Sequence, residues 1–207
     1  MTEHQDDILG PEDTTEEAIS PAPSPRSSAD PLIGTKIGSC TIKRIIGSGG
    51  MGTVYEAVQE KPRRRVALKM MKRGITSRSA TRRFEFESQT LARLQHPGIA
   101  QIYEAGTHDD GSGGVPYFVM EYVASAKPIT QYADDKKLGT KERLALFSKV
   151  CDAVQHGHLK GIVHRDVKPD NVVRERDSDR VVLTDFGIAG ILESGTETIS
   201  RLTQQGQ

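Results

Sequence analysis

Short apolar runs separated by glycine-rich or charged turns fill much of the chain. Residues 40–58 contain two such runs, rich in β-branched residues, on either side of a glycine cluster at 47–52. A third run, 66–69, follows the polar turn KPRRR, and two more, 99–105 and 117–123, flank the loop HDDGSGG. Apolar, β-branched runs bounded by turn residues are typical of strands. The pattern therefore predicts a series of strands joined by short turns.

Three stretches have the periodicity of helices instead. Residues 78–95 form the first, which ends at His96-Pro97 and whose apolar face carries Phe84, Leu91 and Leu94. A short helix is expected over 128–136. A longer helix is expected over 140–159, with Thr140 as the candidate N-cap and with residues recurring at spacings of three and four: Leu144, Phe147, Cys151, Val154 and His158.

One acidic residue interrupts the apolar face of the first helix. Glu87 lies three residues after Phe84 and four before Leu91, so it belongs to the same stripe. A carboxylate that faces a protein core is costly unless a cation pairs with it. Lys69, at the end of the third apolar run, is the partner that we expect, whereas Glu85 points off the stripe.

The polar segment HRDVKPDNVVRERDSDRVVLTDFG follows the last predicted helix. Two apolar runs within it, 172–173 and 181–183, are separated by charged residues, which is the pattern of a strand hairpin. A hairpin brings its ends together, so Asp166, Asn171 and Asp185 should be neighbours. Three oxygen-bearing side chains suit a hard cation such as Mg²⁺, which is usually held by one or two carboxylates together with substrate phosphates.

These motifs resemble those of protein kinases. HRDVKPDN at 164–171 and DFG at 185–187 resemble the catalytic loop and the metal-binding segment, while GSGGMGTV at 47–54 and VALK at 66–69 resemble the glycine-rich loop and the strand with the phosphate-binding lysine. A glycine-rich loop is also the fingerprint of dinucleotide-binding folds, but that motif needs a helix directly after the loop. Residues 53–58 alternate and are β-rich, so a hairpin folded over phosphates is favoured.

The resemblance implies an α+β, bilobal fold whose smaller lobe is an antiparallel sheet with one helix. Residues 36–123 would form this complete smaller lobe and the hinge, and 124–207 a truncated, helical larger lobe as far as the activation loop. Protein kinases continue through an A-P-E segment and further helices. We therefore expect a fragment of a longer reading frame or a chain of marginal stability. Four hydroxyls are candidate activation-loop phosphosites or ordinary exposed side chains: Thr196, Thr198, Ser200 and Thr203.

The resemblance also implies a reaction, the transfer of the ATP γ-phosphoryl group to a serine or threonine hydroxyl of a protein substrate. Asp166 would orient the hydroxyl or accept its proton, and Lys168 would steady the γ-phosphate. Asn171 and Asp185 would hold Mg²⁺.

ATP would be held by residues of both lobes. Lys69, paired with Glu87, would fix the α- and β-phosphates. The backbone amides of the glycine-rich loop would cover the phosphates, and the hinge backbone would bind the adenine edge beside its gatekeeper. The implied ATP-binding residues are Ile46, Gly47, Ser48, Gly49, Gly50, Met51, Gly52, Thr53, Val54, Ala67, Lys69, Met120, Glu121, Val123 and Val173.

Composition bears on the remaining function classes. The chain has 28 basic and 28 acidic residues, so nothing global indicates a nucleic-acid partner. Residues 1–35 are rich in acidic residues, Ser and Pro, and are expected to form a disordered leader. Cys40 and Cys151 are far apart and lack a metal-type spacing. A reduced, cytoplasmic setting is therefore the default expectation. No apolar stretch approaches the roughly 18 residues that indicate a membrane helix.

Two alternatives to an active protein kinase remain open. The first is a catalytically inactive ATP-binding or interaction fragment of a kinase, because the motif residues for ATP are all present while much of the larger lobe is not. The second is a small-molecule phosphotransferase on a related fold. The complete glycine-rich loop, Lys168 and the Ser/Thr-rich segment after residue 187 argue against the second.

Overall fold

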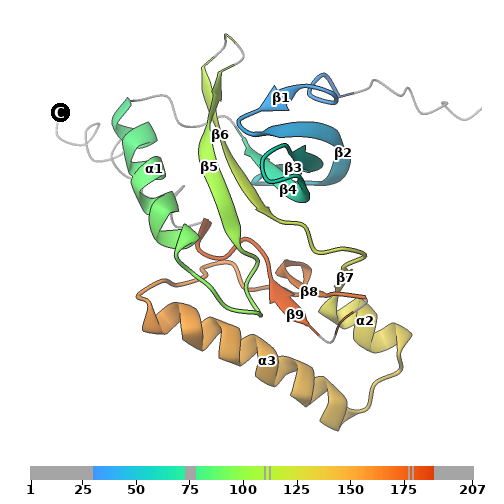
Figure 1. The fold of residues 1–207 in the computed structure, drawn as a ribbon. Coiled ribbons are helices and arrows are strands. Elements are labelled where there is room, and N and C mark those ends of the chain that lie inside the picture. The colour runs from blue at the N-terminus through green and yellow to red at the C-terminus, as the bar shows by residue number, and fades with distance from the viewer. Residues whose placement is uncertain are drawn as a thin grey trace, which may run out of the picture. The chain divides into compact units, whose positions relative to one another are not determined.

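The structure, a computed structural model, describes residues 30–72, 78–109, 111, 113–176, 178 and 180–188. The helices and strands of the described residues all belong to one unit, Pro31–Gln207 (Figure 1). The predicted disordered leader lies outside the described residues, apart from the few positions from Asp30 onward. The four candidate phosphosites lie outside them as well.

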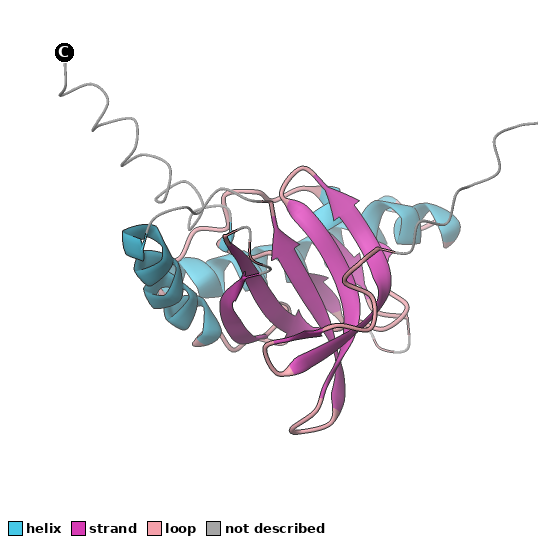
Figure 2. Ribbon diagram, turned by 90° about the horizontal axis from the view of Figure 1, so that it is seen from above, coloured by secondary structure: helices cyan, strands magenta, loops and turns pink. Residues whose placement is uncertain are grey.

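An antiparallel sheet of six strands forms the first part of this unit (Figure 2). Its strand order is β1-β2-β3-β4-β6-β5, so consecutive strands are neighbours except where β6 enters between β4 and β5. The strands are β1 (Lys36–Ile37), β2 (Cys40–Gly49), β3 (Gly52–Gln59), β4 (Arg64–Met71), β5 (Ile102–Asp109) and β6 (Gly114–Glu121). The strands predicted from the apolar runs are thus confirmed, with the last two shifted by about three residues.

Both faces of the sheet carry buried residues at its central strand β4, because alternate residues of this strand enter different apolar clusters. Along β4, Val66 and Leu68 belong to one cluster, whereas Ala67 and Met71 belong to the other. Lys69 has the parity of the second set and is itself buried. A buried cation within an apolar face needs an anionic partner.

The sheet curls until its two edges meet. Ser39, in the turn between β1 and β2, donates a hydrogen bond from its hydroxyl to the carboxylate of Glu104 on β5, the strand at the opposite edge. Tyr117 of β6 donates to the same carboxylate over 2.8 Å. Gly38 precedes Ser39 with φ +53°, and a Cβ there would overlap Glu104 and Tyr117. Closure of the sheet therefore depends on a glycine beside this polar cluster.

Helix α1 (Arg78–Ala92) packs along the edge strand β5 (Figure 1). The predicted apolar face is confirmed, since Phe84, Leu91 and Leu94 are all buried in one cluster. The helix ends three residues earlier than predicted. Leu94 follows in a turn closed by its N–H to the carbonyl of Leu91, at 3.0 Å.

The remaining elements form a second part below the sheet (Figure 1). They are β7 (Lys127–Pro128), α2 (Ile129–Asp135), α3 (Thr140–Leu159), the 3₁₀ turn η1 (Pro169–Asn171), β8 (Val172–Arg174) and β9 (Val181–Leu183). The predicted hairpin is confirmed as β8–β9, to which β7 adds a third strand. The predicted helices are also confirmed, and the α+β arrangement agrees with the sequence-based expectation.

The buried face of α3 differs from the one that its periodicity suggested. Its buried residues are Val150, Ala153 and Gly157. Leu144 and Phe147 are about 60% exposed, with values of 62% and 60%. The predicted N-cap is also displaced by one residue. Gly139 occupies that position and donates its N–H to the carboxylate of Glu142 over 2.8 Å.

Gly157 lets α3 approach the segment after β9 very closely. A Cβ at this position would overlap the ring of Phe186, which is itself buried. A side chain at position 157 would therefore not fit between α3 and Phe186.

We predict that Gly157→Ala lowers the free energy of unfolding by about 1–3 kcal/mol, because the added methyl overpacks a buried ring. Chemical denaturation measures this change. Gly114→Ala is the matched control, since its Cβ would meet its nearest neighbour at an ordinary 3.6 Å. Equal stability of the two variants would contradict the close packing of α3 against Phe186.

Candidate active site

The buried cation of β4 pairs with the acidic residue that follows β9. Lys69 Nζ lies 2.7 Å from Asp185 Oδ2, and the side chains are 5% and 17% exposed. Asp185 has a φ of +59°, a left-handed conformation that Asp and Asn adopt more readily than most residues. The ion pair thus connects Lys69 in the sheet with Asp185, which lies in the turn after β9 in the second part of the fold.

The β8–β9 hairpin joins the two halves of the predicted catalytic segment. The Thr184 N–H donates to the Asn171 carbonyl over 2.9 Å, so Asn171 lies beside the residue that precedes Asp185. The Asn171 N–H in turn donates to the Lys168 carbonyl over 3.0 Å, which closes the turn η1. Asn171 and Asp185, which are 14 positions apart in the sequence, are thereby held at one end of the hairpin.

Asp166 receives hydrogen bonds from two residues of the predicted catalytic loop. Lys168 Nζ donates to Asp166 Oδ2 over 2.8 Å, and Asn171 Nδ2 donates to the same oxygen over 2.9 Å. Asn171 Nδ2 also donates to the backbone carbonyl of Asp166 over 2.8 Å. The hydrogen bond from Lys168, with help from that of Asn171, lowers the pKa of Asp166. The carboxylate is therefore ionised at neutral pH.

His164 holds the Asp166 loop in place through two hydrogen bonds, a role that was not predicted from the sequence. Its side chain is buried, Nδ1 accepts the Asp166 N–H over 3.3 Å, and Nε2 lies 3.1 Å from the Thr184 carbonyl. With Nδ1 as an acceptor, Nε2 carries the proton and donates to that carbonyl. Burial lowers the pKa of His164, which favours this neutral form. Its ring also packs on Phe186, with centroids 4.8 Å apart.

The oxygen atoms near Asp185 fit a hard cation. Both hydrogen bonds that the Asn171 side chain donates use Nδ2, which leaves its Oδ1 as the atom able to coordinate a metal. Among the described residues, no group of three or more His, Cys, Asp and Glu side chains forms a metal site. The carboxylate of Asp185 and the amide oxygen of Asn171 are donors of the type that Mg²⁺ takes together with phosphates and water.

The glycine-rich segment forms the hairpin turn between β2 and β3. Gly47, Ser48 and Gly49 end β2, and Gly52, Thr53 and Val54 begin β3, with Gly50 and Met51 at the turn. Gly52 is required here because φ is +155° and a Cβ would overlap the Met70 carbonyl.

The residues predicted to enclose the adenine come from several strands. Val54 pairs with Lys69, and Ala67 pairs with Met120, in the registers of β3–β4 and β4–β6. Val54, Ala67 and Met120 also belong to one apolar cluster. Ile46 is exposed, whereas Glu121, Val123 and Val173 are half-buried. Glu87 is half-buried on α1, and its predicted contact with Lys69 stays a prediction.

Arg180 ties the hinge to the hairpin and was not anticipated. Its Nη1 lies 2.7 Å from Glu121 Oε1 and 3.6 Å from Glu175 Oε2, and its Nε donates to the Pro97 carbonyl over 3.0 Å. The hydrogen bond with Glu121 raises the pKa of Arg180. One guanidinium thus joins the end of β6, the α1–β5 loop and the end of β8. In the sequence, Arg180 belongs to the charged stretch between two apolar runs, and nothing there distinguishes it from a solvent-exposed turn residue.

Comparison with known proteins agrees with this geometry. Residues 40–205 match the family described as protein kinase domain. The chain is similar to the serine/threonine-protein kinase PrkC of Bacillus subtilis, with 38% identity over 81% of the chain and 25% of the relative. It is also similar to the serine/threonine-protein kinase PknA of Mycobacterium tuberculosis, with 36% identity over 81% of the chain and 39% of the relative.

A solved structure gives the same result. The kinase domain of Mycobacterium tuberculosis PknI superposes with a TM-score of 0.64 at 33% identity, and the match covers 75% of this chain and 62% of that domain. The chain thus spans between a quarter and two fifths of the length of these two curated relatives. Within the described part of the chain, no helix combines the length and apolar character that crossing a membrane requires.

We predict that the Lys69–Asp185 pair couples the stability of the two parts of the fold. Lys69→Met leaves the largely buried carboxylate without its cation, whereas Lys69→Met with Asp185→Asn removes both charges. A double-mutant cycle by chemical denaturation should give a coupling of about 1–3 kcal/mol. The matched control is the Lys127–Asp135 pair, whose side chains are 51% and 46% exposed, so its coupling should stay below about 1 kcal/mol. Equal coupling in both cycles would contradict the assigned role.

Proposed function

Because this chain belongs to the protein kinase family, we propose that it transfers the γ-phosphoryl group of Mg-ATP to a serine or threonine hydroxyl of a protein. The observation that carries the proposal is the convergence of the Lys69–Asp185 ion pair and the Asp166–Lys168–Asn171 cluster on one hairpin. Together these residues supply the ionised carboxylate of Asp166, the cations Lys69 and Lys168, and the amide oxygen of Asn171. Such a set suits phosphoryl transfer, in which positioning and charge stabilisation dominate.

Asp166 is the residue that would handle the substrate hydroxyl. The hydroxyl oxygen forms a bond to the γ-phosphorus, the bond from that phosphorus to the β,γ-bridging oxygen breaks, and ADP leaves. The hydroxyl proton passes to the carboxylate of Asp166. A carboxylate with a lowered pKa is a weak base, so its larger contribution is to orient the hydroxyl and to accept the proton late in the reaction.

The cations of the cluster would hold the phosphates. Lys168, exposed beside Asp166, would contact the γ-phosphate, and its hydrogen bond to Asp166 raises its pKa. Lys69 would exchange part of its contact with Asp185 for the α- and β-phosphates, and Glu87 would restrain it from α1. Asp185 and Asn171 would hold Mg²⁺. When bound, Mg²⁺ would neutralise charge on the β- and γ-phosphate oxygens.

The adenine would lie between the sheet and the β8 strand. Val54 and Ala67 would cover one face of the ring and Val173 the other. Backbone groups of Glu121 and Val123 would bind its edge, and Met120 would border the site. The Arg180–Glu121 ion pair supports this assignment, because it restrains the strand end from which those backbone groups project.

A second candidate function is ATP or partner binding without phosphoryl transfer. The exposed apolar residues of α3, Leu144 and Phe147, favour it, because large apolar side chains gathered on one helix commonly mark an interaction surface. The two candidates share the ATP site and differ only in the transfer step.

We predict that Asp166→Asn reduces transfer by at least about 100-fold and leaves Mg-ATP affinity nearly unchanged, because the residue contacts the hydroxyl and not the nucleotide. Transfer of labelled phosphate to basic test proteins and to small alcohols measures the first effect, and calorimetry the second. Asp134→Asn, on the exposed side of α2, is the control with the same charge change.

Three outcomes separate the candidates. Equal transfer by the parent chain and by Asp166→Asn would contradict the role of Asp166. Binding of Mg-ATP by the parent chain without transfer would select the second candidate function. Phosphorylation of the alcohols in preference to the proteins would contradict a protein substrate.

A further inference from the structure

Strand β9 connects the two ends of the proposed ATP site. Arg180 immediately precedes this strand, and its guanidinium contacts the carboxylate of Glu121 at the end of β6. Asp185 follows the same strand and pairs with Lys69. The start of β9 is therefore attached to the segment that would bind adenine, and its end to the cation that would bind phosphates.

The Arg180 guanidinium uses separate nitrogens for its partners. Nη1 lies 2.7 Å from Glu121 Oε1, and Nε donates to the Pro97 carbonyl over 3.0 Å. The residue is also fixed in the hairpin, because its carbonyl accepts the Glu175 N–H over 3.1 Å. A planar guanidinium presents its donors in a rigid arrangement. The two side-chain contacts can therefore form together and define one orientation of the carboxylate of Glu121.

The second oxygen of Glu121 is held by the residue that precedes β5. Oε2 accepts the Gln101 N–H over 3.4 Å, and the Glu121 N–H donates to the Gln101 carbonyl over 2.8 Å. One carboxylate oxygen thus contacts Arg180 and the other contacts Gln101. With side chain and backbone both bonded, Glu121 has little freedom to rotate or to shift along the hinge.

The side chain of Gln101 extends this set of contacts to α1. Its Nε2 donates to the Ala92 carbonyl over 2.8 Å and to the Ile102 carbonyl over 3.0 Å. Ala92 is the last residue of α1, and the carbonyls of the last helical turn have no partner within the helix. A continuous series of hydrogen bonds therefore runs from Arg180 through Glu121 and Gln101 to the end of α1.

We propose that Arg180 is a positioning residue for the nucleotide, which acts through the carboxylate of Glu121 to fix the hinge backbone relative to β9 and α1. The inference rests on the proposed function in one respect, namely that the backbone of Glu121 and Val123 binds the adenine edge. A backbone that is fixed before the ligand arrives loses less conformational freedom on binding, so the affinity for ATP is higher.

This role differs in its consequences from a contribution to folding alone. A contact that only stabilises the fold changes the melting temperature and leaves the ATP affinity of the folded chain as it was. A positioning contact at the adenine end is made equally before and during phosphoryl transfer. Its loss should therefore raise the KM for ATP and leave kcat nearly unchanged.

The test is a calorimetric titration of the full chain with Mg-ATP in the parent, Arg180→Met, Glu121→Met and the double variant. We expect each single variant to bind Mg-ATP about tenfold more weakly, because the hinge backbone is no longer held in place. The double variant should bind within about twofold of the weaker single variant, because both substitutions remove the same contact. Thermal melts confirm that the variants are folded.

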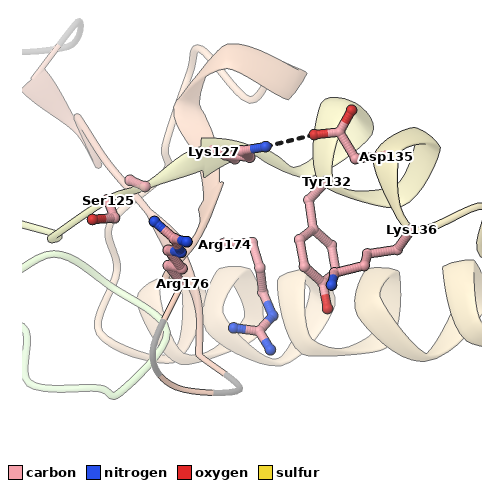
Figure 3. A pocket seen from close by; sticks show the side chains of 8 residues that line it. Ser125, Lys127, Tyr132, Asp135, Lys136, Arg174 and Arg176 are labelled. Carbon is pink, nitrogen blue, oxygen red and sulfur yellow. Dashed lines mark hydrogen bonds and ion pairs between the residues drawn. The ribbon is translucent and has the colours of Figure 1, made fainter.

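Two control variants remove comparable contacts elsewhere. Arg143 makes the same kinds of contact as Arg180, since Nη2 donates to the Asp134 carboxylate over 2.6 Å and Nε to the Leu138 carbonyl over 3.0 Å. Lys127 follows the hinge and is directed toward Asp135 of α2, as Figure 3 shows. Arg143→Met and Lys127→Met should bind Mg-ATP within about twofold of the parent, because neither pair contacts the hinge strand.

Several results would overturn the proposal. They are an Mg-ATP affinity of Arg180→Met equal to or above that of the parent, additive losses in the double variant, and a loss that appears in kcat and not in the KM for ATP. If Arg180→Met does not fold, Arg180→Lys takes its place. Lysine lacks the Nε donor, so about threefold weaker binding is expected and unchanged binding overturns the proposal. A folded parent chain that does not bind Mg-ATP would instead contradict the proposed function itself.

Discussion

The ion pair between Lys69 and Asp185 is the constraint around which this structure is organised. It joins the central part of the sheet to the segment after β9, and both side chains are largely shielded from water. A buried charge that loses its partner is strongly destabilising, so each part of the fold restricts where the other can lie. The same two residues are those that ATP and Mg²⁺ would engage. The contact that joins the parts is therefore also the contact that a nucleotide would have to rearrange.

Other polar contacts hold the surroundings of this pair in register. His164 supports the Asp166 loop through one nitrogen and the Thr184 carbonyl through the other. Arg180 connects the hinge, a loop below α1 and the end of β8. Because these contacts involve groups with fixed geometry, they limit the freedom of the catalytic cluster in the absence of ligand. Outside the Lys69–Asp185 contact, a site held in this way would need little rearrangement before the proposed phosphoryl transfer.

Much of the arrangement was predictable because its signals are local. Alternating apolar runs indicated the strands, the face with Phe84, Leu91 and Leu94 indicated α1, and the charged stretch between two valine-rich runs indicated the hairpin. The features that were missed depend on distant partners. Arg180 bonds to Glu121, 59 residues away, and Lys69 to Asp185, 116 residues away. Periodicity also could not decide which side of α3 packs, because two apolar stripes compete and tertiary contacts select Val150, Ala153 and Gly157.

The most direct test of the central claim is a thermal melt of the purified chain with and without Mg-ATP. A ligand that binds only the folded state stabilises it by about 2.7 kcal/mol at a concentration 100 times its Kd. We predict a cooperative transition that moves to higher temperature with Mg-ATP in the parent chain, and that does not move in Lys69→Met. A parent chain whose midpoint is unchanged by saturating Mg-ATP would contradict the account, because the Lys69–Asp185 cluster would then hold the fold together without binding a nucleotide.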